Sequence, residues 1–173
     1  MIESYRKFIK NGKAVIPAGV TLIEEEAFSG CTELIGIEIP ETVTEIGGLA
    51  FMGCKGLTQI VIPKSVSKIG DLAFFGCSAL ASVEILGPIE LIGAGTFCLC
   101  SNLTKVNIPD TVREIRPHAF STCTSLESIE IPESVRIILD FAFGHCTQLK
   151  QVSIPDSVEE IGYAIFDGCP YIQ

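Results

Sequence analysis

The chain has 173 residues, an apolar fraction of 47% and a formal net charge of −9, with an isoelectric point near 4.7. This length predicts one domain, and the acidic balance argues against nucleic acids and anionic membrane surfaces, which bind clustered Lys and Arg. No apolar run approaches the ~20 residues of a membrane-spanning helix. We therefore expect neither a nucleic-acid partner nor membrane insertion.

Residues 1–15 are predicted to form an N-terminal β-hairpin cap. Asn11-Gly12 lies between two short alternating runs, a pattern typical of a type I′ hairpin. Such a hairpin would cover the sheet edge that the first repeat exposes, and residues 1–7 before it are expected to be loosely ordered or to begin a short helix. Met1–Lys10 lacks the apolar stretch and cleavage site of a secretory signal, so a complete chain is expected to be cytoplasmic.

Residues 16–173 repeat one 23-residue frame, which is clearest in Ile62–Glu84. A fixed period of this length indicates a solenoid in which each repeat forms one coil. Seven copies open with isoleucine, and a second isoleucine follows seven places later in each copy. The other regular columns are phenylalanine (Phe28, Phe51, Phe74, Phe97, Phe120, Phe143 and Phe166) and cysteine (Cys31, Cys54, Cys77, Cys100, Cys123, Cys146 and Cys169).

These columns predict a core made of ladders that run along the stack of coils. One coil alone would expose its column side chains to water, whereas stacking buries them, so each repeat is stable only beside its neighbours. Removal of one phenylalanine ring should then cost ~3–5 kcal/mol of the free energy of unfolding.

Each coil divides into three predicted parts. The stretch Leu34–Pro40, as an example, has apolar side chains at alternating places and is expected to be a strand. Proline ends this strand because it cannot donate to the ladder. The S-V-x-x-I-G piece is expected to be a second short extended segment on the opposite side, and the x-x-A-F-x-G-C piece a single helical or 3₁₀ turn.

The segment L-x-x-I-x-I-P, joined to P-x-S-V-x-x-I-G-x-x-A-F-x-G-C, resembles the BspA-like (Treponema-type) leucine-rich repeat over residues 16–173. The resemblance implies a mostly β, horseshoe-type solenoid of seven repeats, with a parallel sheet on its concave side and short strands and turns on its convex side. It also implies binding and adhesion in place of catalysis. Relatives are commonly exported or displayed at the cell surface, which differs from the expectation for a chain without a signal.

Two repeats depart from the frame. In the fourth, Leu86-Gly87-Pro88-Ile89 replaces the usual opening, which indicates either tolerated drift or a local kink that shapes a binding surface. The seventh ends at Pro170–Gln173 before its concave strand is complete. Because solenoids need polar-faced terminal coils, this end predicts either a paired partner or a truncated longer protein.

The eight cysteines are interpreted as buried, reduced, structural thiols, and only Cys98 lies outside the column. Neighbouring coils would be ~4.8 Å apart, a distance that disulfides tolerate, so spacing alone leaves bridging open. The odd number in the column and the tendency of free cysteine to be buried favour thiols.

The sequence offers little for catalysis. His118 and His145 lie in neighbouring repeats and in different columns, with no carboxylate or cysteine placed beside them as a triad. No Cys/His spacing fits a zinc site, and no glycine-rich phosphate loop occurs. We expect no enzyme activity, no cofactor and no metal.

The concave sheet is the first candidate binding surface. Its outward positions should alternate with the buried ones, and they are small, polar and mildly acidic, without the aromatic anchors that dominate tight interfaces. A solvated sheet and a ligand-binding face are equally consistent with this composition. The positions are Gly36, Glu38, Gln59, Val61, Ser82, Glu84, Lys105, Asn107, Ser128, Glu130, Gln151 and Ser153.

A second candidate surface is an apolar patch on the outer side of the turns in the second to fourth repeats. It consists of Leu49, Met52, Leu72, Phe75 and Cys98. Exposed apolar patches usually mark contact sites, but these side chains could instead fold into the grooves between coils.

The residues and the resemblance together predict a non-catalytic interaction or adhesion module that presents a solenoid surface to a protein or glycan partner. The alternative is a structural repeat protein that associates with itself, end to end or through the apolar patch, or a fragment of a larger surface protein.

Overall fold

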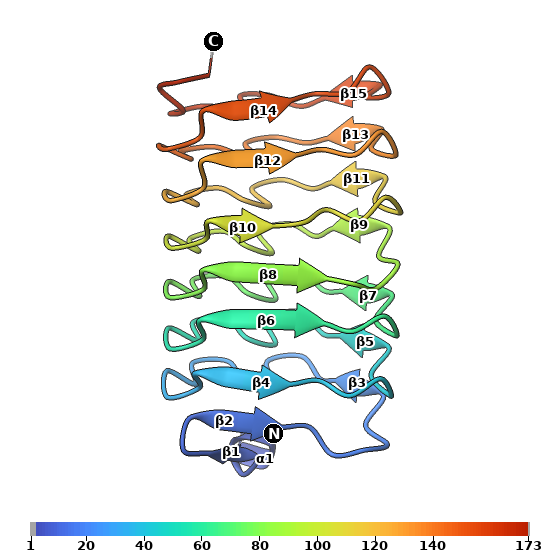
Figure 1. Cartoon of the computed structure of the whole chain (residues 1–173), viewed down its shortest axis with the longest axis vertical. Helices are drawn as coiled ribbons and strands as arrows, with labels where there is room; N and C mark the ends of the chain where they lie inside the picture. The colour runs from blue at the N-terminus through green and yellow to red at the C-terminus, as the bar shows by residue number, and fades with distance from the viewer. Residues whose placement is uncertain (1–2, 173) are drawn as a thin grey trace.

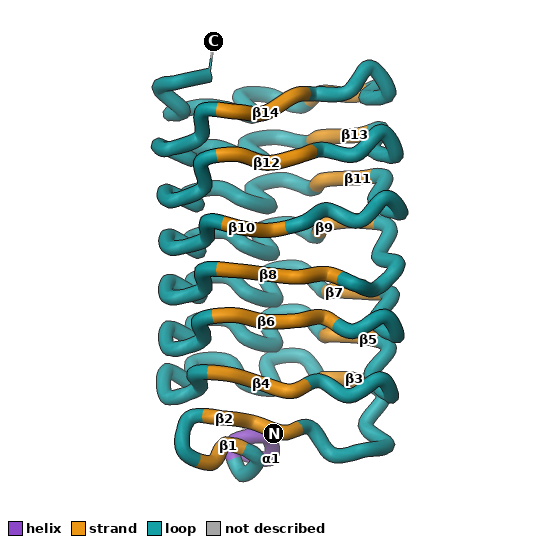
Figure 2. Tube along the Cα trace, viewed as in Figure 1, coloured by secondary structure: helices purple, strands orange, loops and turns teal. Residues whose placement is uncertain are grey.

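The computed structural model describes residues 3–172 and shows a stack of coils, each contributing strands to two opposite sides (Figure 1). Most of each coil consists of turns and loops, and the strands are short (Figure 2). Met1 and Ile2 of the predicted cap, and Gln173 of the predicted last repeat, lie outside the described residues. The predicted solenoid and its two sets of strands are confirmed.

The strands fall into two groups. The concave strands are β2 (Lys13–Val15), β4 (Gly36–Glu38), β6 (Gln59–Ile62), β8 (Ser82–Ile85), β10 (Lys105–Val106), β12 (Ser128–Glu130) and β14 (Gln151–Ser153). The convex strands are β3 (Leu22–Ile23), β5 (Glu45–Ile46), β7 (Lys68–Ile69), β9 (Leu91–Ile92), β11 (Glu114–Ile115), β13 (Ile137–Ile138) and β15 (Glu160–Ile161). Every pairing within either group is parallel.

The N-terminal segment forms a β-hairpin at one end of the stack, with Asn11 and Gly12 as its turn. A short helix, α1 (Glu3–Arg6), precedes β1 (Ile9–Lys10), which pairs antiparallel with β2. Asn11 and Gly12 have φ values of 50° and 78°, as a type I′ turn requires. Strand β2 also pairs with β4, so one strand of the hairpin is itself the first rung of the concave sheet.

The phenylalanine column forms the predicted ladder in the core. Six of its rings, from Phe28 to Phe143, are 0% exposed. Neighbouring rings among these six stack with centroids 5.1–5.5 Å apart. Tyr5 packs edge-on against Phe28 at 5.4 Å and closes the ladder at the N-terminal end. Phe166 stacks on Phe143 at 5.6 Å but is only half-buried.

The corner that contains the phenylalanine is built from consecutive turns, where a single helical or 3₁₀ turn was predicted. Its N–H groups alternate in direction: Ala27 donates back to Glu24 O (3.2 Å), whereas Phe28 donates to Ala50 O of the next coil (2.7 Å). Two residues per coil have positive φ, which interrupts a helix. They are Glu26, Leu49, Leu72, Gly95, His118, Phe141 and Ala164 at the first position, and Gly30, Gly53, Gly76, Leu99, Thr122, His145 and Gly168 at the second.

Neither sheet is continuous along the stack. The concave strands form three groups that separate between β4 and β6 and between β10 and β12, and the convex strands separate between β7 and β9. The convex break lies at the irregular fourth repeat. There Pro88 has no N–H to donate, and Gly87 packs so closely that a Cβ would overlap the carbonyl oxygen of Val66. A groove of about 500 Å³ opens at this break, lined by Ile69, Pro88 and neighbouring residues.

The second positive-φ position allows a test of backbone strain. A Cβ added at Gly76 (φ 69°) would meet no atom within 4 Å, so Gly76→Ala should lower the free energy of unfolding by ~1–2 kcal/mol through its left-handed backbone alone. Thr122 (φ 62°) occupies the equivalent place, and Thr122→Gly should raise that free energy by about 1 kcal/mol. Urea unfolding monitored by circular dichroism measures both changes.

Gly36→Ala is the matched control for this test. A Cβ at Gly36 also meets nothing within 4 Å, but its φ lies outside the left-handed region. This variant should be as stable as the parent chain or slightly more stable. Equal losses for Gly76→Ala and Gly36→Ala would contradict the assignment of strain to the backbone.

Candidate binding surfaces

The concave strands expose every second side chain. In β6, Gln59 and Val61 are exposed, whereas Ile60 and Ile62 are buried. The structure places all twelve predicted outward residues on this face. Glu38, Gln59, Val61, Glu84, Lys105, Asn107, Ser128, Glu130, Gln151 and Ser153 are exposed, and Gly36 and Ser82 are half-buried.

One outward position of the repeat recurs along the whole concave face, and we call this row of side chains the outer column. Strand pairing places Val15 beside Glu38 and Val61 beside Glu84, and Glu130 beside Ser153. Its members are Val15, Glu38, Val61, Glu84, Asn107, Glu130 and Ser153. Val15, which is 57% exposed, was not predicted to be part of this face, because the sequence assigns it to the cap and not to the sheet.

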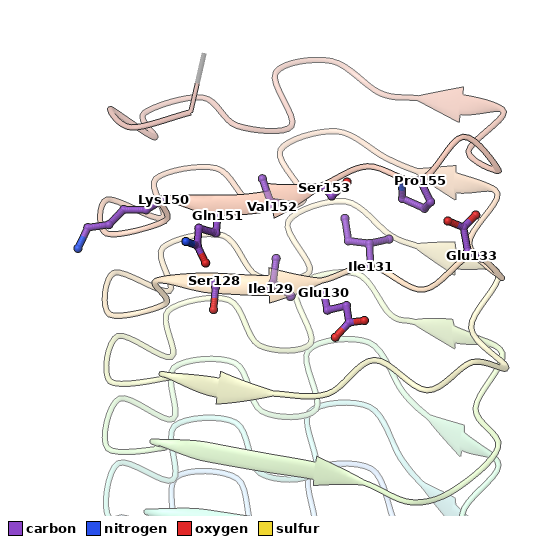
Figure 3. Close-up of a pocket in the computed structure, with 10 residues that line it drawn as sticks. All are labelled: Ser128, Ile129, Glu130, Ile131, Glu133, Lys150, Gln151, Val152, Ser153 and Pro155. Carbon is purple, nitrogen blue, oxygen red and sulfur yellow. The ribbon is translucent and has the colours of Figure 1, made fainter.

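The concave face carries shallow grooves that differ in polarity. The groove over β12 and β14 has a volume of about 640 Å³ and is mostly polar, with Ser128, Glu130, Gln151 and Ser153 among its lining residues (Figure 3). The groove over β2 to β8 has a volume of about 580 Å³. Its lining includes exposed apolar side chains, namely Val15, Val61 and Leu86.

The side chain of Asn107 has a structural role that its position in the sequence does not predict. Its Oδ1 accepts the N–H of Ile85 at 2.7 Å, and its Nδ2 donates to the Ile85 carbonyl at 2.8 Å. The side-chain amide therefore continues the ladder between β8 and β10, whose backbone pairing ends at Val106. This leaves Asn107 less free for a ligand than its exposed neighbours in the outer column.

The predicted apolar patch does not stand out from the surface. Its five members, Leu49, Met52, Leu72, Phe75 and Cys98, are all half-buried. Leu72, for example, lies against the position that a Cβ at Gly95 would occupy. Leu72 therefore fills a groove between coils, and the role of the patch in association stays a prediction.

The two histidines lie on different turn positions. The ring of His118 stacks on Phe141 at 5.2 Å between centroids. Nε2 of His145 is 3.7 Å from Oδ2 of Asp167, with both side chains more than half exposed. The geometry brings neither histidine into a triad. Among residues 3–172, no three His, Cys, Asp or Glu side chains are grouped so that they could hold a metal ion.

The cysteine column makes a hydrogen bond that the residue pattern does not predict. Each thiol from Cys54 onward donates to the carbonyl oxygen of a phenylalanine in the preceding coil. The Sγ–O distances are 3.1 Å for Cys54, Cys77, Cys146 and Cys169, and 3.2 Å for Cys100 and Cys123. All eight cysteines are free thiols.

Burial also changes the acidity of these thiols. Desolvation raises the pKa of the Cys100 and Cys146 thiols to about 12 from the ordinary value of 9.0, and it raises the pKa of Cys123 well above that value. Because the thiolate is the reactive form, these side chains are suited to packing and not to nucleophilic or redox chemistry.

The described part of the chain also contains no helix of the length and apolar character that a membrane crossing requires.

Comparison with known proteins identifies the repeat. The sequence model of the BspA type leucine-rich repeat region, which spans 6 copies, matches residues 3–127 and 114–173. The chain belongs to the BspA-type leucine-rich repeat family. None of the curated proteins compared with it matches.

Solved structures of other leucine-rich repeat proteins have the same fold. A protein from Eubacterium ventriosum is 31% identical, with a TM-score of 0.88 over 95% of this chain and 44% of that one. A protein from Bacteroides ovatus is 29% identical, with a TM-score of 0.74 over 94% and 48%. A Treponema pallidum leucine-rich repeat protein is 31% identical, with a TM-score of 0.89 over 94% and 78%. This BspA-type chain thus spans less than half the length of the first two.

The buried thiols predict how the stability of this BspA-type solenoid depends on pH. Unfolded thiols lose their protons near the ordinary pKa of 9.0, whereas the folded thiols of Cys100 and Cys146 keep theirs up to about 12. The unfolded state therefore binds fewer protons between these values, and the free energy of unfolding should fall as pH rises through this range. Below pH 9 the contribution of the thiols to stability is fully present.

Urea unfolding at several pH values from about 8 to about 11 measures this slope. The variant Cys100→Ala/Cys146→Ala, which lacks two of the titrating thiols, should show a shallower fall. An identical slope in the variant and the parent chain would contradict the role of the thiols.

Proposed function

We propose that this leucine-rich repeat chain is a non-catalytic interaction module that binds a macromolecular partner through its concave face. The observation that carries the proposal is the outer column. It holds exposed carboxylates and exposed valines on a framework whose phenylalanine column is completely buried from Phe28 to Phe143. Solenoids commonly bind their partners through extended concave surfaces of this kind.

A protein partner fits this face better than a glycan. Within the described concave strands, no aromatic ring is exposed that could stack on a sugar. The face instead offers apolar side chains, carboxylates and a lysine, as at Val61, Glu84 and Lys105. Side chains of these types pair with apolar and charged groups of another protein.

Self-association through the last coil is a second candidate function. Ile161 is 54% exposed, whereas the six earlier residues of its column, from Ile23 to Ile138, are at most 4% exposed. Tyr163 and Tyr171 are also exposed in this coil. Another coil laid on this surface would bury them, and light scattering over a concentration series detects the resulting increase in mass.

A pair of matched arginine substitutions tests the concave-face proposal. Gln59→Arg places a bulky cation on the concave face, and Ser67→Arg places one beside the convex strand β7, at a side chain that is also exposed. Peptide ligands are first selected against the immobilised parent chain from a displayed library, and glycans are screened on an array. Gln59→Arg should weaken binding of selected ligands by about 10-fold, and Ser67→Arg by less than about 2-fold.

Two results would contradict the proposal. One is equal weakening by the two substitutions, and the other is the absence of any saturable ligand in both screens. Thermal unfolding of both variants provides the control for folding.

A further inference from the structure

The outer column alternates between apolar and acidic side chains over its first four coils. Val15 and Val61 are 57% and 49% exposed. Glu38 lies between these two valines, Glu84 follows Val61, and both glutamates are exposed. Glu130 continues the acidic positions two coils beyond Glu84. Within residues 3–172, these three carboxylates form no ion pair with a lysine, arginine or histidine, so they remain available to a partner.

The spacing of this column matches an α-helix. The stacked rings of the core lie 5.1–5.5 Å apart, and the hydrogen-bonded strands of the concave face lie about 4.8 Å apart. Both distances are close to the ~5.4 Å pitch of an α-helix. Carboxylates two coils apart are thus separated by roughly 9.5–11 Å, and residues i and i+7 of a helix by about 10.5 Å. A helix that lies along the stack can therefore present one side chain to each coil.

Other backbone conformations do not present one side chain to each coil. An extended strand places same-face side chains about 6.8 Å apart, and the mismatch with the coils grows at every step. Side chains on one face of a polyproline II segment recur every ~9.3 Å. Such a segment could reach Glu38 and Glu84, but it would present no side chain to Val61, which lies halfway between them. Only the helix serves both the apolar and the acidic positions.

The width of the face agrees with the same occupant. The concave strands have two to four residues, or about 7–13 Å, and a helix with its side chains is about 10–12 Å wide. Beside the outer column runs a second outward column whose middle members, Gly36, Gln59 and Ser82, are small or uncharged. This column leaves room for the body of a helix.

We propose that the concave face from β2 to β12 binds an amphipathic α-helix of a partner protein, laid along the stack. Lys or Arg residues at i, i+7 and i+14 of this helix pair with Glu38, Glu84 and Glu130. Apolar residues one turn before i and one turn after it contact Val15 and Val61. The inference rests on the proposed concave-face function and names the class of partner.

A synthetic helix is the probe for this inference. It is an alanine-rich, fluorescein-labelled peptide of about 22 residues, long enough to be helical, with Lys at i, i+7 and i+14 and Leu at i−4 and i+3. A control peptide has the same composition but spaces its lysines at i, i+5 and i+10, which scatters them around the helix. A third peptide carries prolines that prevent a helix.

Fluorescence anisotropy should show the heptad-spaced probe binding the parent chain at least about 10-fold more tightly than either control peptide. Glu84→Lys and Val61→Asp should each weaken the probe by about 10-fold. Glu160→Lys is the matched control, because it makes the same change of charge at an exposed residue of the convex strand β15, away from the concave face. It should change the affinity by less than about 2-fold.

Three outcomes would overturn the inference: equal binding of the probe and the control peptides, equal weakening by Glu84→Lys and Glu160→Lys, or no saturable binding up to about 1 mM probe. These outcomes are separable from failure of the proposed function. If library-selected ligands are lost in Gln59→Arg while the helical probe binds no better than its controls, the concave-face function stands and the helical partner is wrong. Circular dichroism of each variant confirms that it is folded.

Discussion

The structure depends on the contact between one coil and the next. At its centre, a phenylalanine ring stacks on the ring of the preceding coil, and a cysteine thiol donates to a phenylalanine carbonyl there. Both partners recur at the same place in every repeat, so the same contact is made again along the stack. No coil has a core of its own, and burial arises only where two coils meet.

This contact also determines what the surface can do. Because the rings hold neighbouring coils at a nearly constant distance in the core, each outward position of the repeat recurs once in every coil and forms a column along the stack. The alternation of valine and glutamate in the outer column is therefore a regular pattern in space as well as in sequence. The framework provides the spacing, and the variable positions of each repeat provide the chemistry.

Much of this architecture follows from the fixed period of the sequence. The period predicts the ladders of Phe and Cys, the short convex strands and the outward residues of the concave face, because each depends on a position that recurs in every coil.

Features that depend on single residues were less predictable. The amide of Asn107 replaces a backbone rung, and residue type alone does not distinguish such a role from ligand binding. The left-handed backbone at Leu99 and Thr122 could not be predicted because leucine and threonine rarely adopt it. The thiol hydrogen bonds were missed because a buried cysteine also packs as an apolar side chain.

Adjacent phenylalanines allow the most direct test of the coil-to-coil contact. Phe74 is 0% exposed and stacks on rings of both neighbouring coils, whereas Phe75 is half-buried on the outer side of the same turn. The free energy of unfolding of Phe74→Ala and Phe75→Ala, measured in urea, should fall by ~3–5 kcal/mol for the first and by less than about half as much for the second. Equal losses for the two variants would show that the stacked ladder does not hold the coils together.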